Sequence, residues 1–182
     1  EHIFEGYQDE MEYLTEHEPR NKFIRNLACD LKGNTLVLFN YVDRHGLPLY
    51  EMINSYTDKS VHLVYGGVDV DDREQIRRLV ENENDQIIVA SYGTFSTGIN
   101  IKRLHNVVFA SPSKSRVRNL QSIGRVLRKG KDKVRATLYD IADDISTDHG
   151  NNYTYKHLKE RIKIYKEEDF DYEILNIKVK ND

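Results

Sequence analysis

The sequence predicts an α/β fold in which helices flank a parallel sheet. Short runs rich in β-branched residues are almost continuously apolar, and segments with helical spacing of apolar residues separate them. Strands that are apolar on both sides are typical of a sheet covered on both faces, and strand–helix alternation at about 25-residue spacing indicates parallel strands. The chain of 182 residues is long enough to bury a real core.

Five strands are predicted from these apolar runs. They cover 35–39, 61–65, 86–90, 106–110 and 135–142. The apolar periodicity predicts a helix over 20–31, and Asp69, Asp71 and Asp72 suit the cap and first turn of a second helix. A third helix is predicted over 114–128, with Ser113 as its cap. The segment 43–56 is a less regular helix because Gly46 and Pro48 lie within it.

The C-terminal part differs from the rest, so we expect a domain over 1–150 and a tail over 151–182 that packs onto it. Four residues at helical spacing predict a helix in this tail: Tyr155, Leu158, Ile162 and Tyr165. The stretch 172–179 is a possible edge strand.

Composition excludes several classes of protein. With 38% hydrophobic and 31% charged residues, the chain is expected to be globular and not disordered. Cys29 is the single cysteine, which excludes a disulfide framework, and the histidines lack ligand spacing, so no metal site is predicted. We expect Asp140, Asp143 and Asp144 to be capping or solvated groups. No apolar run is long enough to span a membrane and the first residues do not resemble a signal peptide, so a cytoplasmic protein is expected.

The net charge of −3 hides an uneven distribution of charge. Residues 1–18 contain seven acidic residues and no Lys or Arg, whereas residues 114–135 contain nine basic residues and one acid, Asp132. A basic cluster within an acidic chain favours a local phosphate partner, although a solvated basic helix face would look the same by composition.

The stretch QSIGRVLRKG (121–130) makes the phosphate interpretation more specific. Gln121, Arg125 and Arg128 fall on one stripe of a helix, and two guanidinium groups side by side favour an anion across them. No P-loop is present to hold that anion, since Asp132 stands after Gly130-Lys131 where Ser or Thr is required. The economical hypothesis is that another domain holds the phosphate and that Arg125 and Arg128 reach it as arginine fingers.

Four stretches in order resemble the motifs of superfamily-two helicases. QSIGRVLR (121–128) is similar to motif VI and VASYGTFSTGINI (89–101) to motif V. TLVLFNYVDRHG (35–46) is similar to motif IV and VYGGVDVDDREQIRRL (64–79) to motif IVa. The chain is therefore identified as the C-terminal, RecA-like lobe of such a helicase.

The resemblance implies a motor of two lobes with ATP between them. The N-terminal lobe would hold most of the contacts to ATP and Mg²⁺, while Arg128 and Arg125 would be the arginine fingers and Gln121 would relay the nucleotide state. Gly98 would let the backbone approach the nucleotide and Asn100 would contact the ribose. Asn100 departs from the commoner Asp, which weakens that role.

The resemblance also implies a nucleic-acid site in the loops that follow the strands. Backbone N–H groups and short hydroxyls there would hold the phosphates of a strand without reading its sequence. The residues expected to do so are Asn40, Tyr41, Arg44, Gly66, Gly67, Ser91, Thr94 and Lys114. Gly66-Gly67 is equally well explained as a tight turn. Within the family, phage recombination helicases are the most similar, which implies branched DNA and RNA–DNA hybrids as partners, no membrane, and a monomer.

Two alternatives remain open. A RecA-like module could bind nucleic acid or a partner without nucleotide chemistry, but such a binder has no need of the Gln-x-x-Gly-Arg-x-x-Arg spacing. The motor lobe of a translocating restriction enzyme or chromatin remodeller shares the motifs, but the short tail leaves no room for an added nuclease domain within this chain.

Overall fold

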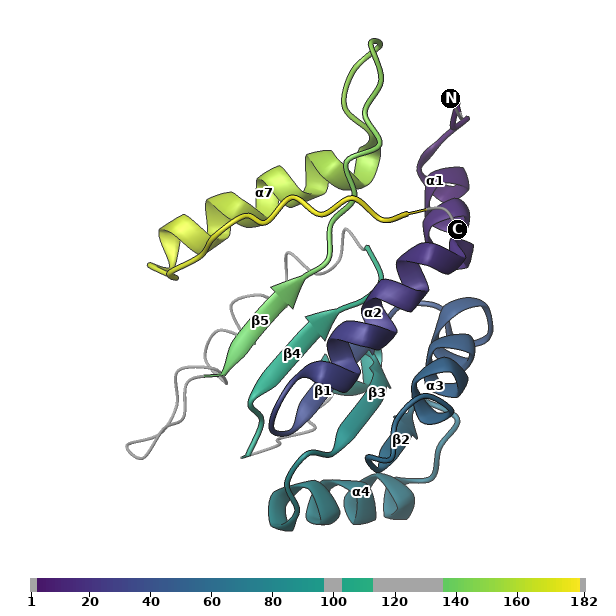
Figure 1. Cartoon of the computed structure of the whole chain (residues 1–182), viewed down its shortest axis with the longest axis vertical. Coiled ribbons are helices and arrows are strands. Elements are labelled where there is room, and N and C mark those ends of the chain that lie inside the picture. The colour runs from purple at the N-terminus through teal and green to yellow at the C-terminus, as the bar shows by residue number, and fades with distance from the viewer. Residues whose placement is uncertain (1–2, 97–102, 113–135, 181–182) are drawn as a thin grey trace.

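The computed structural model describes residues 3–96, 103–112 and 136–180 (Figure 1). It contains a five-stranded sheet with the order β2-β3-β1-β4-β5, and every neighbouring pair is parallel. The strands are β1 (Thr35–Phe39), β2 (Val61–Val64), β3 (Ile87–Ser91), β4 (Asn106–Phe109) and β5 (Thr137–Asp140). The predicted α/β fold with five parallel strands is confirmed.

Helices connect and cover these strands. They are α1 (Tyr7–Glu16), α2 (Glu18–Asp30), α3 (Leu47–Asn54), α4 (Val70–Asn82), α5 (Tyr92–Ser96) and α7 (Tyr153–Glu167). Asp69 caps α4 by accepting the Asp71 N–H at 3.0 Å, as its position predicted. The predicted helix over 114–128 and its cap Ser113 lie outside the described residues.

The segment 43–56 is helical, but in two parts. Val42–Gly46 forms a single π-helical turn, η1, and α3 begins only at Leu47, with Pro48 in its first turn where a missing N–H does no harm. A Cβ on Gly46 would lie 2.4 Å from the Phe39 ring, so only glycine allows this turn to pack on the end of β1.

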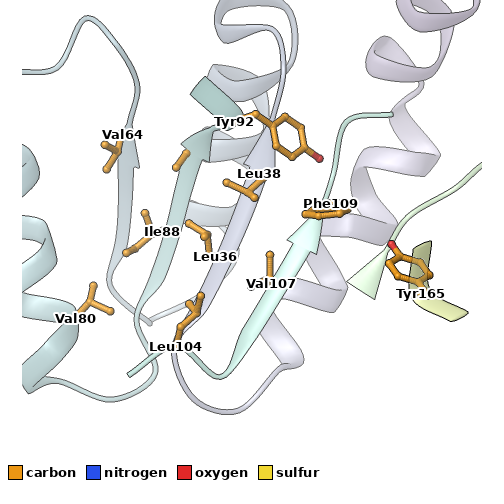
Figure 2. Close-up of a cluster of buried hydrophobic side chains, with 11 residues drawn as sticks. Leu36, Leu38, Val64, Val80, Ile88, Tyr92, Leu104, Val107, Phe109 and Tyr165 are labelled. Carbon is orange, nitrogen blue, oxygen red and sulfur yellow. The ribbon is translucent and has the colours of Figure 1, made fainter. Parts of the chain in front are cut away.

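Each face of the sheet carries its own core cluster. Side chains that alternate along the central strands point to opposite faces. Val37, Val89 and Val108 meet the helices α2 and α3 on one face. On the other face Leu36, Ile88 and Val107 meet side chains from other elements, including Val80 of α4 and Tyr165 of α7 (Figure 2). Burial on both faces explains why these strands are almost continuously apolar.

The C-terminal helix α7 is fastened to the sheet by a buried ion pair. Arg161, 1% exposed, donates from Nε to Asp140 Oδ2 at 2.7 Å and from Nη2 to Oδ1 at 3.0 Å. The Tyr165 hydroxyl donates to the same carboxylate at 2.6 Å. The prediction that Asp140 is a capping or solvated group is therefore wrong, because its carboxylate compensates a buried guanidinium at the end of β5.

The predicted edge strand over 172–179 is also wrong. The described chain from Phe170 to Lys180 forms neither helix nor strand. Ile174, Leu175 and Ile177 are 59%, 70% and 57% exposed, so neither side of the segment is buried and no pairing register is selected.

Candidate nucleic-acid interface

The loops that follow the strands lie along one edge of the sheet, because all five strands are parallel. Phe39 at the end of β1 is in register with Ser91 at the end of β3, and β4 lies on the other side of β1. The predicted nucleic-acid residues after β1 and β3 are thus brought to adjacent positions, and Gly66 and Gly67 follow the outer strand β2.

The loop after β1 presents Asn40, Tyr41 and Arg44 at this edge. Asn40 and Arg44 are exposed, and Tyr41 is half-buried. The Tyr41 carbonyl accepts N–H groups from both His45 at 3.1 Å and Gly46 at 2.8 Å, which closes the π-helical turn. This turn sets the direction in which Arg44 leaves the sheet.

Two of these residues contact the acidic helix α1. Arg44 Nη1 lies 2.7 Å from Glu12 Oε1 and Arg44 Nε lies 3.7 Å from Glu16 Oε1. The Tyr41 hydroxyl donates to Gln8 Oε1 at 3.4 Å. The hydrogen bond from Arg44 lowers the pKa of Glu12, and the pKa of Arg44 is raised by the same contact. Both side chains of the Arg44–Glu12 pair are over 40% exposed, so the pair is open to exchange with a solvent anion.

The end of β3 and the first turn of α5, together called the β3 loop, carry the hydroxyls of Ser91 and Thr94. Their oxygens lie 2.7 Å apart, and Ser91 Oγ also accepts the Thr94 N–H at 3.3 Å. Thr94 is 5% exposed, so its hydroxyl is engaged within the loop, whereas Ser91 is half-buried. Of the two, Ser91 is the one nearer to solvent.

The two glycines after β2 form a tight turn. The Val68 N–H donates to the Tyr65 carbonyl at 2.9 Å across Gly66 and Gly67, and both glycines are exposed. A Cβ on Gly66 would meet nothing within 4 Å, so its backbone is open to approach from outside. A tight turn is therefore present, and the nucleic-acid role of the two glycines stays a prediction.

Sequence reasoning missed a buried polar cluster beneath the β1 loop. Its members are Arg20, Asn21, His45, Ser111 and Asp143. Arg20 donates from Nη1 to the Ala110 carbonyl at 2.7 Å and from Nε to Asp143 Oδ1 at 2.8 Å, so Asp143, expected as a capping or solvated group, is ion-paired. His45 is fully buried, and desolvation, together with the nearby Arg20 charge, lowers its pKa to about 3. The polar spacing of these residues carries no periodic signal, so a pattern search does not detect them.

Several predicted site residues lie outside the described residues. They are Gly98, Asn100, Lys114, Gln121, Arg125 and Arg128. Within the described residues, no three His, Cys, Asp or Glu side chains are grouped as a metal ion would require. Among the helices described, none combines the length and apolar character needed to cross a membrane.

Comparison with known proteins identifies the family of the chain. The model of the helicase conserved C-terminal domain matches residues 19–130. The chain belongs to this family of helicase C-terminal domains. Residues 19–130 include the β1 loop, the β3 loop and the Gln121–Arg128 stretch, so the helicase C-terminal domain contains most of the predicted site.

Individual proteins agree with the family assignment. The chain is 41% identical over 179 residues to the ATP-dependent DNA helicase uvsW of Enterobacteria phage T4. The match covers 91% of this chain and 35% of that protein. It matches the crystal structure of T4 UvsW with a TM-score of 0.77 at 40% identity, covering 91% of this chain and 36% of that one. The C-terminal part of the Fun30 ATPase domain matches at a TM-score of 0.50 and 19% identity, covering 76% of this chain and 49% of that chain, and shows the shared fold alone. The chain thus spans about a third of its viral relative.

Proposed function

We propose that this chain is the second motor lobe of an ATP-dependent helicase or translocase that acts on DNA and RNA–DNA hybrids at branched recombination and replication intermediates. The observation that carries the proposal is the Gln-x-x-Gly-Arg-x-x-Arg spacing in a helicase C-terminal domain whose sequence has no P-loop. The relative named as an ATP-dependent DNA helicase supports DNA as the partner.

In this function Arg128 and Arg125 act as arginine fingers on ATP held by the N-terminal RecA-like lobe. That lobe also supplies most of the Mg²⁺ contacts, while Gln121, Gly98 and Asn100 line this chain's side of the nucleotide. ATP binding closes the two lobes of one monomer, and hydrolysis with product release opens them. Guanidinium groups stabilise the charge that develops on the transferring phosphoryl group, and each closing step carries the nucleic-acid loops along the strand.

The nucleic-acid strand runs along the carboxyl edge of the sheet. Asn40, Tyr41 and Arg44 contact it from the β1 loop and Ser91 from the β3 loop, with Thr94 supporting Ser91. The open backbone of Gly66-Gly67 and the side chain of Lys114 add contacts to neighbouring phosphates. Exposed amides and hydroxyls and one exchangeable guanidinium are suited to a nucleic-acid backbone. The motor must bind and release this backbone without regard to base sequence.

Substitution of Arg128 tests the proposal. In the full-length protein, Arg128→Ala should lower ATP turnover at saturating DNA by about 10³–10⁵-fold, because the finger acts on the transition state and not on the bound nucleotide. Nucleotide and DNA affinities should stay within about twofold of wild type. Arg128→Lys should restore little, since a point charge does not reproduce the planar fork.

An exposed arginine on α4, Arg78, provides the control. Arg78→Ala should turn over ATP like wild type. Near-normal turnover in Arg128→Ala would contradict the arginine-finger assignment and leave the stripe a role in DNA contact or lobe packing.

A further inference from the structure

Ser111, two residues beyond the end of β4, is a buried junction between the β1 loop and the β3 loop. Its Oγ accepts the Asn40 N–H at 3.0 Å, and its hydroxyl is hydrogen-bonded to His45 Nδ1. Its carbonyl accepts the Tyr92 hydroxyl at 3.2 Å, and its own N–H donates to the Leu38 carbonyl at 3.4 Å. Ser111 is 0% exposed, and its contacts with His45 and Tyr92 are buried, whereas the Asn40 N–H lies at the edge of the exposed β1 loop.

The direction of each hydrogen bond follows from its neighbours. Asn21 donates from Nδ2 to the Thr15 carbonyl at 2.9 Å, which leaves Asn21 Oδ1 as an acceptor for His45 Nε2–H at 2.9 Å. His45 Nδ1 is then an acceptor, and the Ser111 hydroxyl donates a hydrogen bond to it. The Ser111 oxygen in turn accepts the Asn40 N–H, so the donor and the acceptor of every hydrogen bond in this series are fixed.

Burial keeps this arrangement in a single protonation state. The pKa of His45 is lowered to about 3 by desolvation and by the nearby Arg20 charge, so the imidazole is neutral at physiological pH. A neutral imidazole with one donor and one acceptor is what Asn21 and Ser111 require. The hydrogen-bonded series that runs from Thr15 through Asn21, His45 and Ser111 to Asn40 therefore keeps one geometry and does not switch with pH.

Ser111 connects this hydrogen-bonded series to both loops. Asn40 opens the loop that carries Tyr41 and Arg44. Tyr92 lies between Ser91 and Thr94, and its ring packs edge-to-face on Phe109 with 5.7 Å between centroids (Figure 2). Both loops are thus hydrogen-bonded to Ser111, just beyond the end of β4.

We propose that Ser111 and His45 are positioning residues that fix the distance between the β1 loop and the β3 loop, and so match their contacts to consecutive phosphates of one strand. This inference rests on the proposed function. Neither side chain reaches the nucleic acid, since both are fully buried. Loops held in place before binding lose less conformational entropy when they bind, which is how buried bonds raise affinity at the surface.

The test measures ATP turnover by the full-length protein as a function of single-stranded oligonucleotide concentration. Ser111→Ala should raise the half-maximal DNA concentration roughly tenfold, since it leaves the Asn40 N–H and His45 Nδ1 without a partner. Turnover at saturating DNA should change by less than about twofold, because the nucleotide contacts are untouched.

The matched control is Tyr165→Phe, which removes a hydrogen bond to Asp140 at the end of β5, a strand that carries neither the β1 loop nor the β3 loop. It should lower the melting temperature much as Ser111→Ala does, but leave the half-maximal DNA concentration at the wild-type value. An equal response of the two variants at equal melting temperature would overturn the inference, because Ser111 would then act through stability alone.

Two substitutions of His45 separate its two bonds. His45→Asn places an amide oxygen near the former Nδ1 and retains the hydrogen bond to Ser111. His45→Gln extends an amide N–H toward Asn21 and loses the hydrogen bond to Ser111. His45→Asn should therefore bind DNA more tightly than His45→Gln. The reverse order would overturn the inference.

Failure of the proposed function gives a different result. If DNA does not stimulate ATP turnover of the wild-type protein, both the proposed function and this inference fail. If DNA stimulates turnover and Arg44→Ala raises the half-maximal DNA concentration while Ser111→Ala matches Tyr165→Phe, the inference alone fails.

Discussion

His45 shows what one buried side chain contributes to this fold. Its imidazole has no exposed surface, and both ring nitrogens have a partner in Ser111 and Asn21. The ordinary pKa of a histidine is about 6.5, and burial lowers that of His45 to about 3. Folding therefore excludes a proton that the unfolded chain binds.

This difference predicts how stability depends on pH. Between pH 6.5 and pH 3 the unfolded state binds the proton and the native state does not, so the free energy of unfolding falls as the pH falls. The slope from this one group is at most about 1.4 kcal/mol per pH unit, and its contribution is fully present above pH 6.5.

Urea titrations of wild type and His45→Asn between pH 4.5 and pH 7.5 measure the effect. Carboxylates titrate in both proteins, so the difference between the two curves isolates His45. The wild-type protein should lose more stability on acidification than the variant. Parallel curves would show that the native state accepts the proton.

Residue-scale features are also where the sequence carried least information. The strands were predictable because each central strand is buried on both faces, which leaves an apolar run with a physical cause. Ser111 and His45 belong to no periodic pattern, and only the folded sheet brings them together across 66 residues. Arg44 was predicted to face phosphates, but its contact with Glu12 depends on how α1 docks.

Helix α1 is the main element that the sequence analysis did not predict. Its apolar stripe of Tyr7, Met11 and Leu14 has helical spacing, but the surrounding acids obscured it. Docked beside the β1 loop, α1 places two carboxylates on Arg44 where the proposed function requires a phosphate.

Removing these charges should strengthen nucleic-acid binding. The double substitution Glu12→Gln and Glu16→Gln should tighten DNA binding by about two- to fivefold, since exposed ion pairs are weak and compete with phosphate on equal terms. Fluorescence anisotropy with labelled single-stranded DNA at two salt concentrations measures the change.

Glu18→Gln is the control, because it removes an exposed acid that pairs with Lys22 on α2 and does not contact Arg44. It should leave affinity close to wild type. An equal gain per removed charge in the two variants would mean that net charge alone, and not the contact with Arg44, sets the affinity.

The attachment of α7 makes a second prediction at the scale of elements. Asp140→Asn leaves the Arg161 guanidinium buried without a compensating charge, so the free energy of unfolding should fall by about 3–5 kcal/mol. Asp144→Asn, in the exposed loop before α7, should cost far less. Chemical denaturation of both variants compares them directly, and equal losses would show that Arg161 is compensated by other groups.

At the scale of the whole molecule, the chain is one of the two motor lobes in the proposed function. The sequence has an arginine pair for phosphate and no P-loop, so we expect the isolated 182-residue chain to show no nucleic-acid-stimulated ATP turnover. It should still bind DNA weakly, with strong salt dependence, because backbone contacts release counterions.

Both measurements use the isolated chain beside the full-length protein. Cooperative urea unfolding of the isolated chain shows that it is folded when turnover is absent. Steady ATP turnover by the isolated chain would contradict the division of labour between lobes.

The contact between α1 and α7 also determines when this molecule can finish folding. Glu10 is fully buried on α1, and its carboxylate accepts the N–H groups of Tyr153 at 2.9 Å and Thr154 at 2.6 Å, at the start of α7. These partners lie 143 and 144 residues downstream. A ribosome adding roughly 5–20 residues per second needs on the order of ten to thirty seconds to cover that distance. Until α7 has been synthesised, the Glu10 carboxylate on α1 lacks these two partners. The docking of α1 is therefore among the last steps of folding during synthesis.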